Sequence, residues 1–381
     1  MKEVDIKMKF EDLKINGKII NGLENMGIKE PTEIQKEVIP VAINGENLIG
    51  QSETGTGKTL AYLLPTIEKI DTSKKEMQCI ILAPTHELAI QINNTINELK
   101  KAANLDITST SLIGSANIKR QIDSLKAKPH IIVGSAGRIL ELIGKKKVSA
   151  HTIKTIIIDE VDKLLDKNNL QVIKNIIKAT QKQTQIMMFS ATLNSKTLDI
   201  AKTLKDDLKV ISVKNNKVNE NISHNYIKTD SRRKIDTLRK LIHASKAERI
   251  LVFNNDTYTT NTAIENLTAS KIKVSAIGGN NKMEERKKAL EDFRKGNIQV
   301  LIASDVAARG LDIKGVTHVI NMDIPEDSND YLHRAGRVGR AGETGDVFSL
   351  VDDREEKIIK NHEKNFKIDI IEKHLYKGNI E

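Results

Sequence analysis

A glycine-rich segment at residues 52–59 constrains the fold of this chain more than any other part of its sequence. It follows an apolar run at 47–50, precedes a helical pattern at 60–64, and reads Ser52, Glu53, Thr54, Gly55, Thr56, Gly57, Lys58 and Thr59. Phosphate-binding loops have this strand–loop–helix arrangement, because the glycines let the backbone turn so that several N–H groups point at one anion. The segment therefore predicts a nucleotide-binding α/β domain.

Two side chains at the end of this loop indicate a nucleoside triphosphate with Mg²⁺ as the ligand. Lys58 is placed to reach the β- and γ-phosphates, and the Thr59 hydroxyl is placed to ligate Mg²⁺. The start of the following helix adds a partial positive charge. The alternative is an ordinary glycine-rich turn before a helix, which the Gly-Lys-Thr sequence and the flanking elements disfavour.

Short apolar runs alternate with amphipathic helical patterns along the chain, which predicts parallel sheets covered by helices on both faces. The predicted strands are 47–50, 78–83, 107–112, 130–133, 155–159 and 185–190, then 249–253, 273–276, 300–303, 318–321 and 346–351. Predicted helices include 87–100, 163–178 and 282–294, and the tail after 353 is expected to form one helix and a short ending. The pattern loosens into a polar stretch at 210–226, so we predict a first domain at 1–214, a linker at 215–219 and a second domain at 220–381.

The composition narrows the class of protein. The formal net charge of +10 favours a polyanionic partner, although a general bias toward lysine would give the same charge. The single cysteine, Cys79, lies in a predicted buried strand and can form neither a disulfide framework nor a zinc cluster. No apolar stretch suits a signal peptide or a membrane span, so we expect a cytoplasmic protein without a membrane partner. With aromatic residues at 3%, contacts with the backbone of a nucleic acid are expected rather than base stacking.

A run of acidic residues ends the predicted strand at 155–159. Asp159, Glu160 and Asp162 follow three isoleucines, which places Asp159 at the carboxyl edge of the sheet, where open α/β folds bind ligands. Asp159 is expected to hold Mg²⁺ largely through water, and Glu160 to orient and deprotonate the attacking water. The alternative, a solvated acidic loop, is weakened by the phosphate loop upstream.

An arginine cluster occupies residues 331–342 of the second unit. Arg334, Arg337 and Arg340 are three apart and can share one helix face. Guanidinium groups stabilise the charge that develops on the γ-phosphoryl oxygens during hydrolysis. A solvated basic helix is the alternative, but the interleaved glycines cost about 1 kcal/mol each in a helix and favour the functional interpretation.

With these three motifs placed, the sequence resembles the DEAD-box RNA helicases of helicase superfamily 2 from about Phe10 to Asp352, as a minimal bacterial-type core with no RNA-binding domain expected after Glu381. Phe10 and the segment 27–35 resemble the Q motif of that family. The resemblance implies that Gln35 reads the adenine edge, that Thr32 supports it, and that Phe10 packs on the ring. Thr32 can cap a helix at the same time.

Further segments follow the family order, and their roles are implied by the resemblance. Residues 84–89 and 135–138 resemble the two RNA-contacting motifs of the first domain, 190–192 the coupling motif, and 303–312 a motif that contacts both RNA and nucleotide. The implied RNA contacts are Pro84, Thr85, His86, Gly114, Ser135, Gly137, Arg138, Arg286 and Ser304. The implied coupling residues are Asp162, Ser190 and Thr192. The implied nucleotide contacts of the second domain are Gly310, Asp312, His333, Arg337 and Arg340.

The resemblance implies two tandem RecA-like domains joined by a short linker, and an RNA-dependent ATPase that uses ATP and Mg²⁺. Closure of the domains would locally unwind short RNA duplexes or remodel RNA–protein complexes, in ribosome assembly or general RNA metabolism. The partners expected are single-stranded or short duplex RNA, with ribosomal precursors or a partner protein supplying specificity. One alternative is an ATP-gated RNA clamp or annealing chaperone that hydrolyses ATP only for release. A second is a DNA-directed translocase of the same superfamily, which the segment from Phe10 to Gln35 disfavours.

Departures from the family pattern lie mostly at the implied RNA contacts. His86 replaces an arginine, Ala136 a proline and Ser115 a glycine, while Gly278 and Met283 stand where the family has His and Gln. At the implied ATP site, Val161 replaces alanine and leaves the carboxylates in place. One hypothesis is a complete ATP site with weakened RNA binding, and the other is neutral drift at tolerant surface positions.

Overall fold

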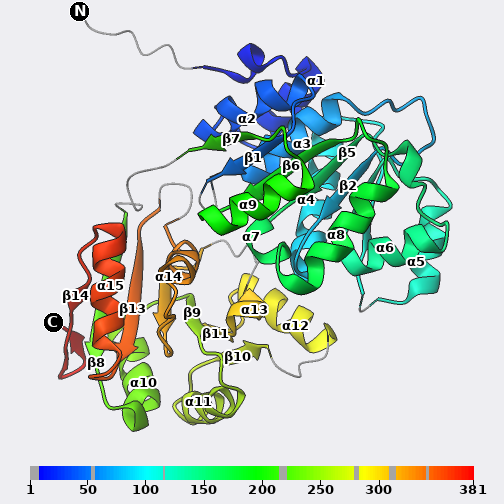
Figure 1. Ribbon diagram of the computed structural model, residues 1–381. Coiled ribbons are helices and arrows are strands. Elements are labelled where there is room, and N and C mark those ends of the chain that lie inside the picture. The colour runs from blue at the N-terminus through cyan, green and yellow to red at the C-terminus, as the bar shows by residue number, and fades with distance from the viewer. Residues whose placement is uncertain are drawn as a thin grey trace, which may run out of the picture. The chain divides into compact units, whose positions relative to one another are not determined.

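A computed structural model of the chain describes residues 8–52, 56–114, 116–213, 221–278, 283–308, 315–339 and 343–381. The chain divides into two compact units, Met1–Asn215 and Asn216–Glu381, each a parallel sheet with helices on both faces (Figure 1). The predicted linker at 215–219 lies outside the described residues, so the predicted domain boundaries stay a prediction. Among the residues that the structure describes, no helix is long and apolar enough to cross a bilayer.

The first unit contains a seven-stranded parallel sheet in the order β3-β4-β2-β5-β6-β1-β7. Its strands are β1 (Leu48–Gln51), β2 (Cys79–Leu82), β3 (Ser109–Leu112), β4 (Ile131–Gly134), β5 (Thr155–Ile158), β6 (Gln185–Ser190) and β7 (Lys209–Ser212). Its helices are η1 (Phe10–Leu13), α1 (Gly17–Asn25), α2 (Glu33–Ile43), α3 (Lys58–Glu68), α4 (His86–Ala102), α5 (Ile118–Leu125), α6 (Ala136–Gly144), η2 (Ala150–Thr152), α7 (Val161–Leu164), α8 (Lys167–Ala179) and α9 (Ser195–Leu204).

Two apolar cores lie on the two faces of this sheet because successive side chains of a strand point to opposite faces. On β5, Ile157 packs into the core formed with α1 to α4, whereas Ile156 and Ile158 pack into the core formed with α5 to α9. Both faces are covered, which is why the central strands are continuous apolar runs. Cys79 is buried on β2, as predicted.

The second unit repeats this architecture with a sheet in the order β10-β11-β9-β12-β13-β8-β14. Its strands are β8 (Ile222–Lys228), β9 (Ile250–Phe253), β10 (Val274–Ile277), β11 (Val300–Ala303), β12 (His318–Asn321), β13 (Gly345–Val351) and β14 (Ile371–Glu372), followed by the hairpin β15 (Leu375–Tyr376) and β16 (Asn379–Ile380). Its helices are η3 (Ser231–Arg233), α10 (Lys234–Ser245), α11 (Thr257–Ala269), α12 (Met283–Arg294), α13 (Asp305–Ala308), α14 (Ser328–Ala335) and α15 (Glu356–Phe366).

The structure confirms the predicted α/β class and corrects several elements. The helix predicted at 163–178 is two helices, α7 and α8. The polar stretch at 210–226 includes most of β7 and part of β8. β7 is an edge strand with one buried side chain, Ile211, and β8 buries the polar His224 and Asn225, so neither strand has an apolar run that sequence patterns detect. The tail also forms three short strands after α15.

Candidate nucleotide- and RNA-binding sites

The phosphate loop joins β1 to α3, as the sequence predicts. Gly57 begins the helix at φ +93°, a left-handed conformation that favours glycine. Ser52 is buried and its hydroxyl lies 2.8 Å from that of Thr56, while the Lys58 ammonium donates to the Ser52 carbonyl oxygen. Thr59 follows in the first turn of α3. Glu53, Thr54 and Gly55, which complete the predicted loop, lie outside the described residues.

Gln35 connects the Q-like segment to this loop. Its side chain is 1% exposed; Oε1 accepts from the backbone N–H of Thr32 at 3.0 Å, and Nε2 donates to the Gly57 carbonyl oxygen at 3.1 Å. A Cβ atom on Gly57 would lie 2.5 Å from Nε2, so only glycine permits this approach. Phe10, the first residue of η1, is buried in the core of the first unit. Two of the predicted adenine contacts, Thr32 and Gln35, therefore adjoin the phosphate loop in the fold, and the contact of Phe10 with adenine stays a prediction.

The acidic end of β5 lies beside the same helix. Asp159 is 4% exposed; its carboxylate accepts from the Tyr62 hydroxyl and from the backbone N–H of Glu160, each at 2.9 Å. Burial, reinforced by the negative charge of Glu160, raises the pKa of Asp159 to about 6 against the opposing effect of Lys58. Burial and the neighbouring Asp159 also raise the pKa of Tyr62. Tyr62 was not predicted, although it lies one helical turn after Lys58 and Thr59.

The donors at this edge fit a divalent metal ion. The Thr59 hydroxyl and the Asp159 carboxylate are the hard oxygen ligands that Mg²⁺ prefers. The raised pKa of Asp159 marks a buried negative charge that a nearby cation would relieve. Glu160 adopts φ +49° between β5 and α7 and is less buried than Asp159, which suits a side chain that acts on solvent.

The three predicted coupling residues contact one another. The Ser190 hydroxyl, at the end of β6, donates to one carboxylate oxygen of Asp162 at 2.6 Å. The Thr192 hydroxyl donates to the second carboxylate oxygen of Asp162 at 3.3 Å. The backbone N–H of Thr192 donates to the Ser190 hydroxyl oxygen at 3.1 Å. Asp162 is therefore held at the end of the neighbouring strand by both hydroxyl groups.

The predicted RNA contacts of the first unit follow the carboxyl ends of three adjacent strands, β2, β3 and β4. After Pro84, Thr85 caps α4 through a bond from the Leu88 N–H at 3.2 Å, and His86 is the first helical residue. A Cβ atom on Gly114 would lie 3.6 Å from the His86 ring, so these two segments adjoin.

Arg138 supports the Gly114 segment. Its guanidinium donates to the carbonyl oxygens of Gly114 and Ala116 at 2.7 and 3.3 Å and pairs with Glu141 at 3.1 Å. Its side chain is 10% exposed. Ser135 precedes α6, and Gly137 in its first turn has open space on its Cβ side. The RNA-contacting roles of these residues stay predictions.

In the second unit, the predicted RNA contacts Ser304 and Arg286 meet at Ala307. Arg286 donates to the Ala307 carbonyl oxygen at 2.8 Å, and the Ala307 N–H donates to the Ser304 hydroxyl at 3.3 Å. Gly278, which has φ +143°, lies beside Ser304, because a Cβ atom on Gly278 would lie 2.9 Å from the Ser304 hydroxyl oxygen. Gly310, Asp312 and Arg340 lie outside the described residues, as does the side chain of Met283.

The predicted shared helix face of the arginine cluster is wrong. Helix α14 ends at Ala335, so Arg337 lies in the turn that follows, where glycine stops the helix. Arg337 is 7% exposed. His333 remains on α14 with Nδ1 at 3.7 Å from Asp330, and its Nε2 is buried without a hydrogen-bond partner among the described residues.

Arg334 has a structural role that sequence spacing did not reveal. It is 2% exposed and binds both carboxylate oxygens of Asp305 at 2.7 Å, with a further contact to Asp323 at 3.2 Å. Burial alone would raise the pKa of Asp305, but the guanidinium outweighs it and lowers that pKa. The cluster is therefore not a solvated basic helix, because its first arginine is neutralised inside the domain.

Two models of known protein families match this chain, one in each of its two units. A family model described as DEAD/DEAH box helicase matches residues 32–200, and one described as helicase conserved C-terminal domain matches residues 233–342. The chain is 39% identical to the DEAD-box ATP-dependent RNA helicase CshC of Bacillus cereus, over 94% of this chain and 91% of the relative. It is also 39% identical to the probable ATP-dependent RNA helicase YfmL of Bacillus subtilis, over 91% of each protein.

A solved structure of S. cerevisiae Dbp5 bound to RNA and ADP BeF3 shows the same architecture. It aligns with a TM-score of 0.86 and 29% identity over 95% of each chain. The two parallel sheets are thus those of tandem RecA-like domains.

Proposed function

Because this chain belongs to the DEAD-box family of ATP-dependent RNA helicases, we propose that it is an RNA-dependent ATPase that locally unwinds short RNA duplexes and remodels RNA–protein complexes. Membership makes it an ATP-hydrolysing enzyme. The observation that carries the proposal is the Gln35–Gly57 contact, which joins the expected adenine site to the phosphate loop, with Asp159 and Glu160 at the same sheet edge.

Each residue of this edge has a proposed part in hydrolysis. The phosphate loop and Lys58 hold the triphosphate, and Glu160 orients and deprotonates the attacking water. Thr59 and Asp159 hold Mg²⁺, which supplies charge neutralisation at the phosphates when bound. His333, Arg337 and Arg340 of the second unit act on the γ-phosphate after ATP-driven closure.

RNA is proposed to bind by its backbone along the carboxyl ends of both sheets, near Thr85, His86 and Gly114 in one unit and Ser304 and Arg286 in the other. Dbp5, solved with RNA, supports this partner class. Closure would bend the bound strand, and a bent strand cannot remain in an A-form duplex. Structured RNAs such as ribosomal precursors, or targets chosen by a partner protein, are the proposed substrates.

The test is Mg·ATP hydrolysis with single-stranded RNA, with DNA of the same sequence and with neither, beside Glu160→Gln. We expect stimulation by RNA alone, since only RNA carries the 2′-hydroxyl, and loss of turnover with retained nucleotide binding in the variant. A rate of hydrolysis that is the same with and without RNA would refute the proposal. Strand separation of a short duplex then distinguishes unwinding from an RNA clamp, which would bind the duplex and leave it paired.

A further inference from the structure

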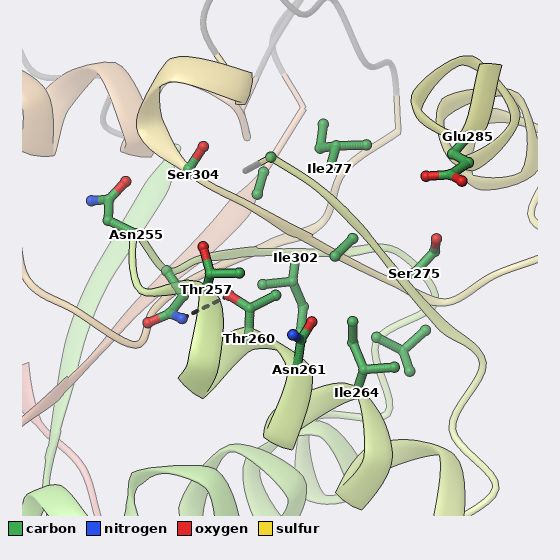
Figure 2. A pocket seen from close by; sticks show the side chains of 15 residues that line it. Asn255, Thr257, Thr260, Asn261, Ile264, Ser275, Ile277, Glu285, Ile302 and Ser304 are labelled. Atoms are coloured by element: carbon green, nitrogen blue, oxygen red, sulfur yellow. Dashed lines mark hydrogen bonds between the residues drawn. The ribbon is translucent and has the colours of Figure 1, made fainter. Parts of the chain in front are cut away.

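The second unit contains a pocket of about 490 Å³ that runs along the edge strand β10 and reaches the carboxyl ends of β9 and β11 (Figure 2). Helix α11 forms one wall with Thr257, Thr260, Asn261 and Ile264, and β10 and β11 form the opposite wall. The carboxyl ends of parallel strands are where open α/β folds bind their ligands. The volume lies in the range of sites that enclose small organic groups.

The pocket lining is nearly uncharged. Among the described residues that line it, none is Lys, Arg or His, and the one charged side chain is the carboxylate of Glu285. Hydroxyl and carboxamide groups alternate with the apolar side chains of Ile264, Val274 and Ile302. A phosphate would find no cation here, whereas a planar nucleobase needs apolar walls and neutral hydrogen-bonding groups for its edge.

The α11 wall is held in place before any ligand binds. Asn254 is 6% exposed, and its side-chain NH₂ donates to the Thr260 hydroxyl at 2.8 Å, the dashed line of Figure 2, and to the Asp256 carbonyl oxygen at 2.7 Å. The Thr260 hydroxyl donates to the same carbonyl at 2.9 Å. These bonds join the first turn of α11 to the end of β9, so a ligand need not order this wall.

The pocket opens beside a proposed RNA contact. Ser304 and Gly278 belong to its lining, and Ser304 is the proposed phosphate contact of the second unit. A base and its own phosphate are separated by one sugar. A strand held at Ser304 can therefore turn one unpaired base into the pocket.

We propose that this pocket binds a single unpaired nucleobase of the RNA. The inference rests on the proposed function and adds a base-dependent contact to a site expected to read only the backbone. Asn261 and Ser275, from opposite walls, are the groups proposed to bind the base edge.

The experiment measures the concentration of a short single-stranded RNA that half-saturates the ATPase of the full chain, with one abasic nucleotide moved along the strand. We expect one position to raise this concentration by roughly fivefold, the effect of losing one hydrogen-bonded contact to a base, and the others to have little effect. In Asn261→Leu and in Ser275→Ile, which fills the pocket, the position-specific effect should disappear.

Asn266→Leu is the matched control, because Asn266 is exposed on the same helix and does not line the pocket. It should retain the wild-type abasic profile. Two results would refute base binding in the pocket and leave the proposed function intact. One is an RNA-stimulated wild type whose half-saturating RNA concentration does not depend on the abasic position. The other is a wild-type dependence on that position in both pocket variants. Absence of any RNA stimulation overturns both.

Discussion

Replacing Asp159 with asparagine should make the protein more stable while removing its activity. The wild-type carboxylate is buried, with a pKa of about 6, and each pKa unit corresponds to about 1.4 kcal/mol. Keeping Asp159 ionised at neutral pH therefore costs the folded state about 3 kcal/mol. The carboxamide of the variant is not ionised, but it can satisfy only one of the two donors unless the Tyr62 hydroxyl rotates to accept, a loss of about 1 kcal/mol.

The net gain for Asp159→Asn is about 2 kcal/mol, which raises the melting temperature of a unit of this size by roughly 4–8 °C. Because the folded-state pKa is raised above the unfolded value of about 3.9, the cost is fully present above about pH 6, shrinks as the pH falls through 6, and is absent below about pH 4. The stabilisation of Asp159→Asn should therefore be largest above about pH 6 and disappear below about pH 4.

The assay is thermal unfolding of the nucleotide-free protein at about pH 8 and pH 5, with Asp123→Asn as control because that carboxylate is 65% exposed. The control should have the melting temperature of the wild type at both pH values. Equal or lower stability of Asp159→Asn at the higher pH, or a gain that does not shrink at the lower pH, would refute the reasoning. Loss of Mg·ATP hydrolysis in the variant is expected in either case.

Three further changes test other contacts. Gln35→Ala removes the bond to Gly57 and should weaken nucleotide binding by about fivefold, measured with a fluorescent ATP analogue; unchanged affinity would contradict the link between adenine site and phosphate loop. Ser190→Ala frees one oxygen of Asp162 and should reduce strand separation more than RNA-stimulated hydrolysis, so equal losses in the two assays would argue against coupling. His86→Arg should tighten RNA binding and steepen its logarithmic salt dependence by about 0.7, whereas an unchanged salt slope would favour neutral drift at this position.

Much of the fold could be predicted because its signals are local. Apolar runs such as 185–190, 300–303 and 318–321 coincide with strands β6, β11 and β12, since strands buried on both faces must be continuously apolar. Strands β7 and β8 could not be predicted. β7 lies at the sheet edge with a single buried side chain. β8 buries the polar side chains of His224 and Asn225, which bond to Tyr331 and Val347 of other elements.

The arginine cluster shows where prediction from residue spacing fails. Arg334 and Arg337 are three residues apart, which permits a shared helix face, but α14 ends between them. Arg334 is then neutralised by Asp305, which lies 29 residues earlier in the chain. No local pattern distinguishes a buried, neutralised guanidinium from one that faces a ligand.

Local sequence patterns were sufficient to predict the α/β class, the phosphate loop and the acidic strand end, because each depends on residues that are close together in the chain. Three other features could be seen only in the folded chain: Gln35 contacts Gly57, Tyr62 donates to a carboxylate 97 residues away, and a nearly uncharged pocket opens beside Ser304. These contacts depend on how the ends of parallel strands gather at one sheet edge, which brings together side chains that are distant along the chain.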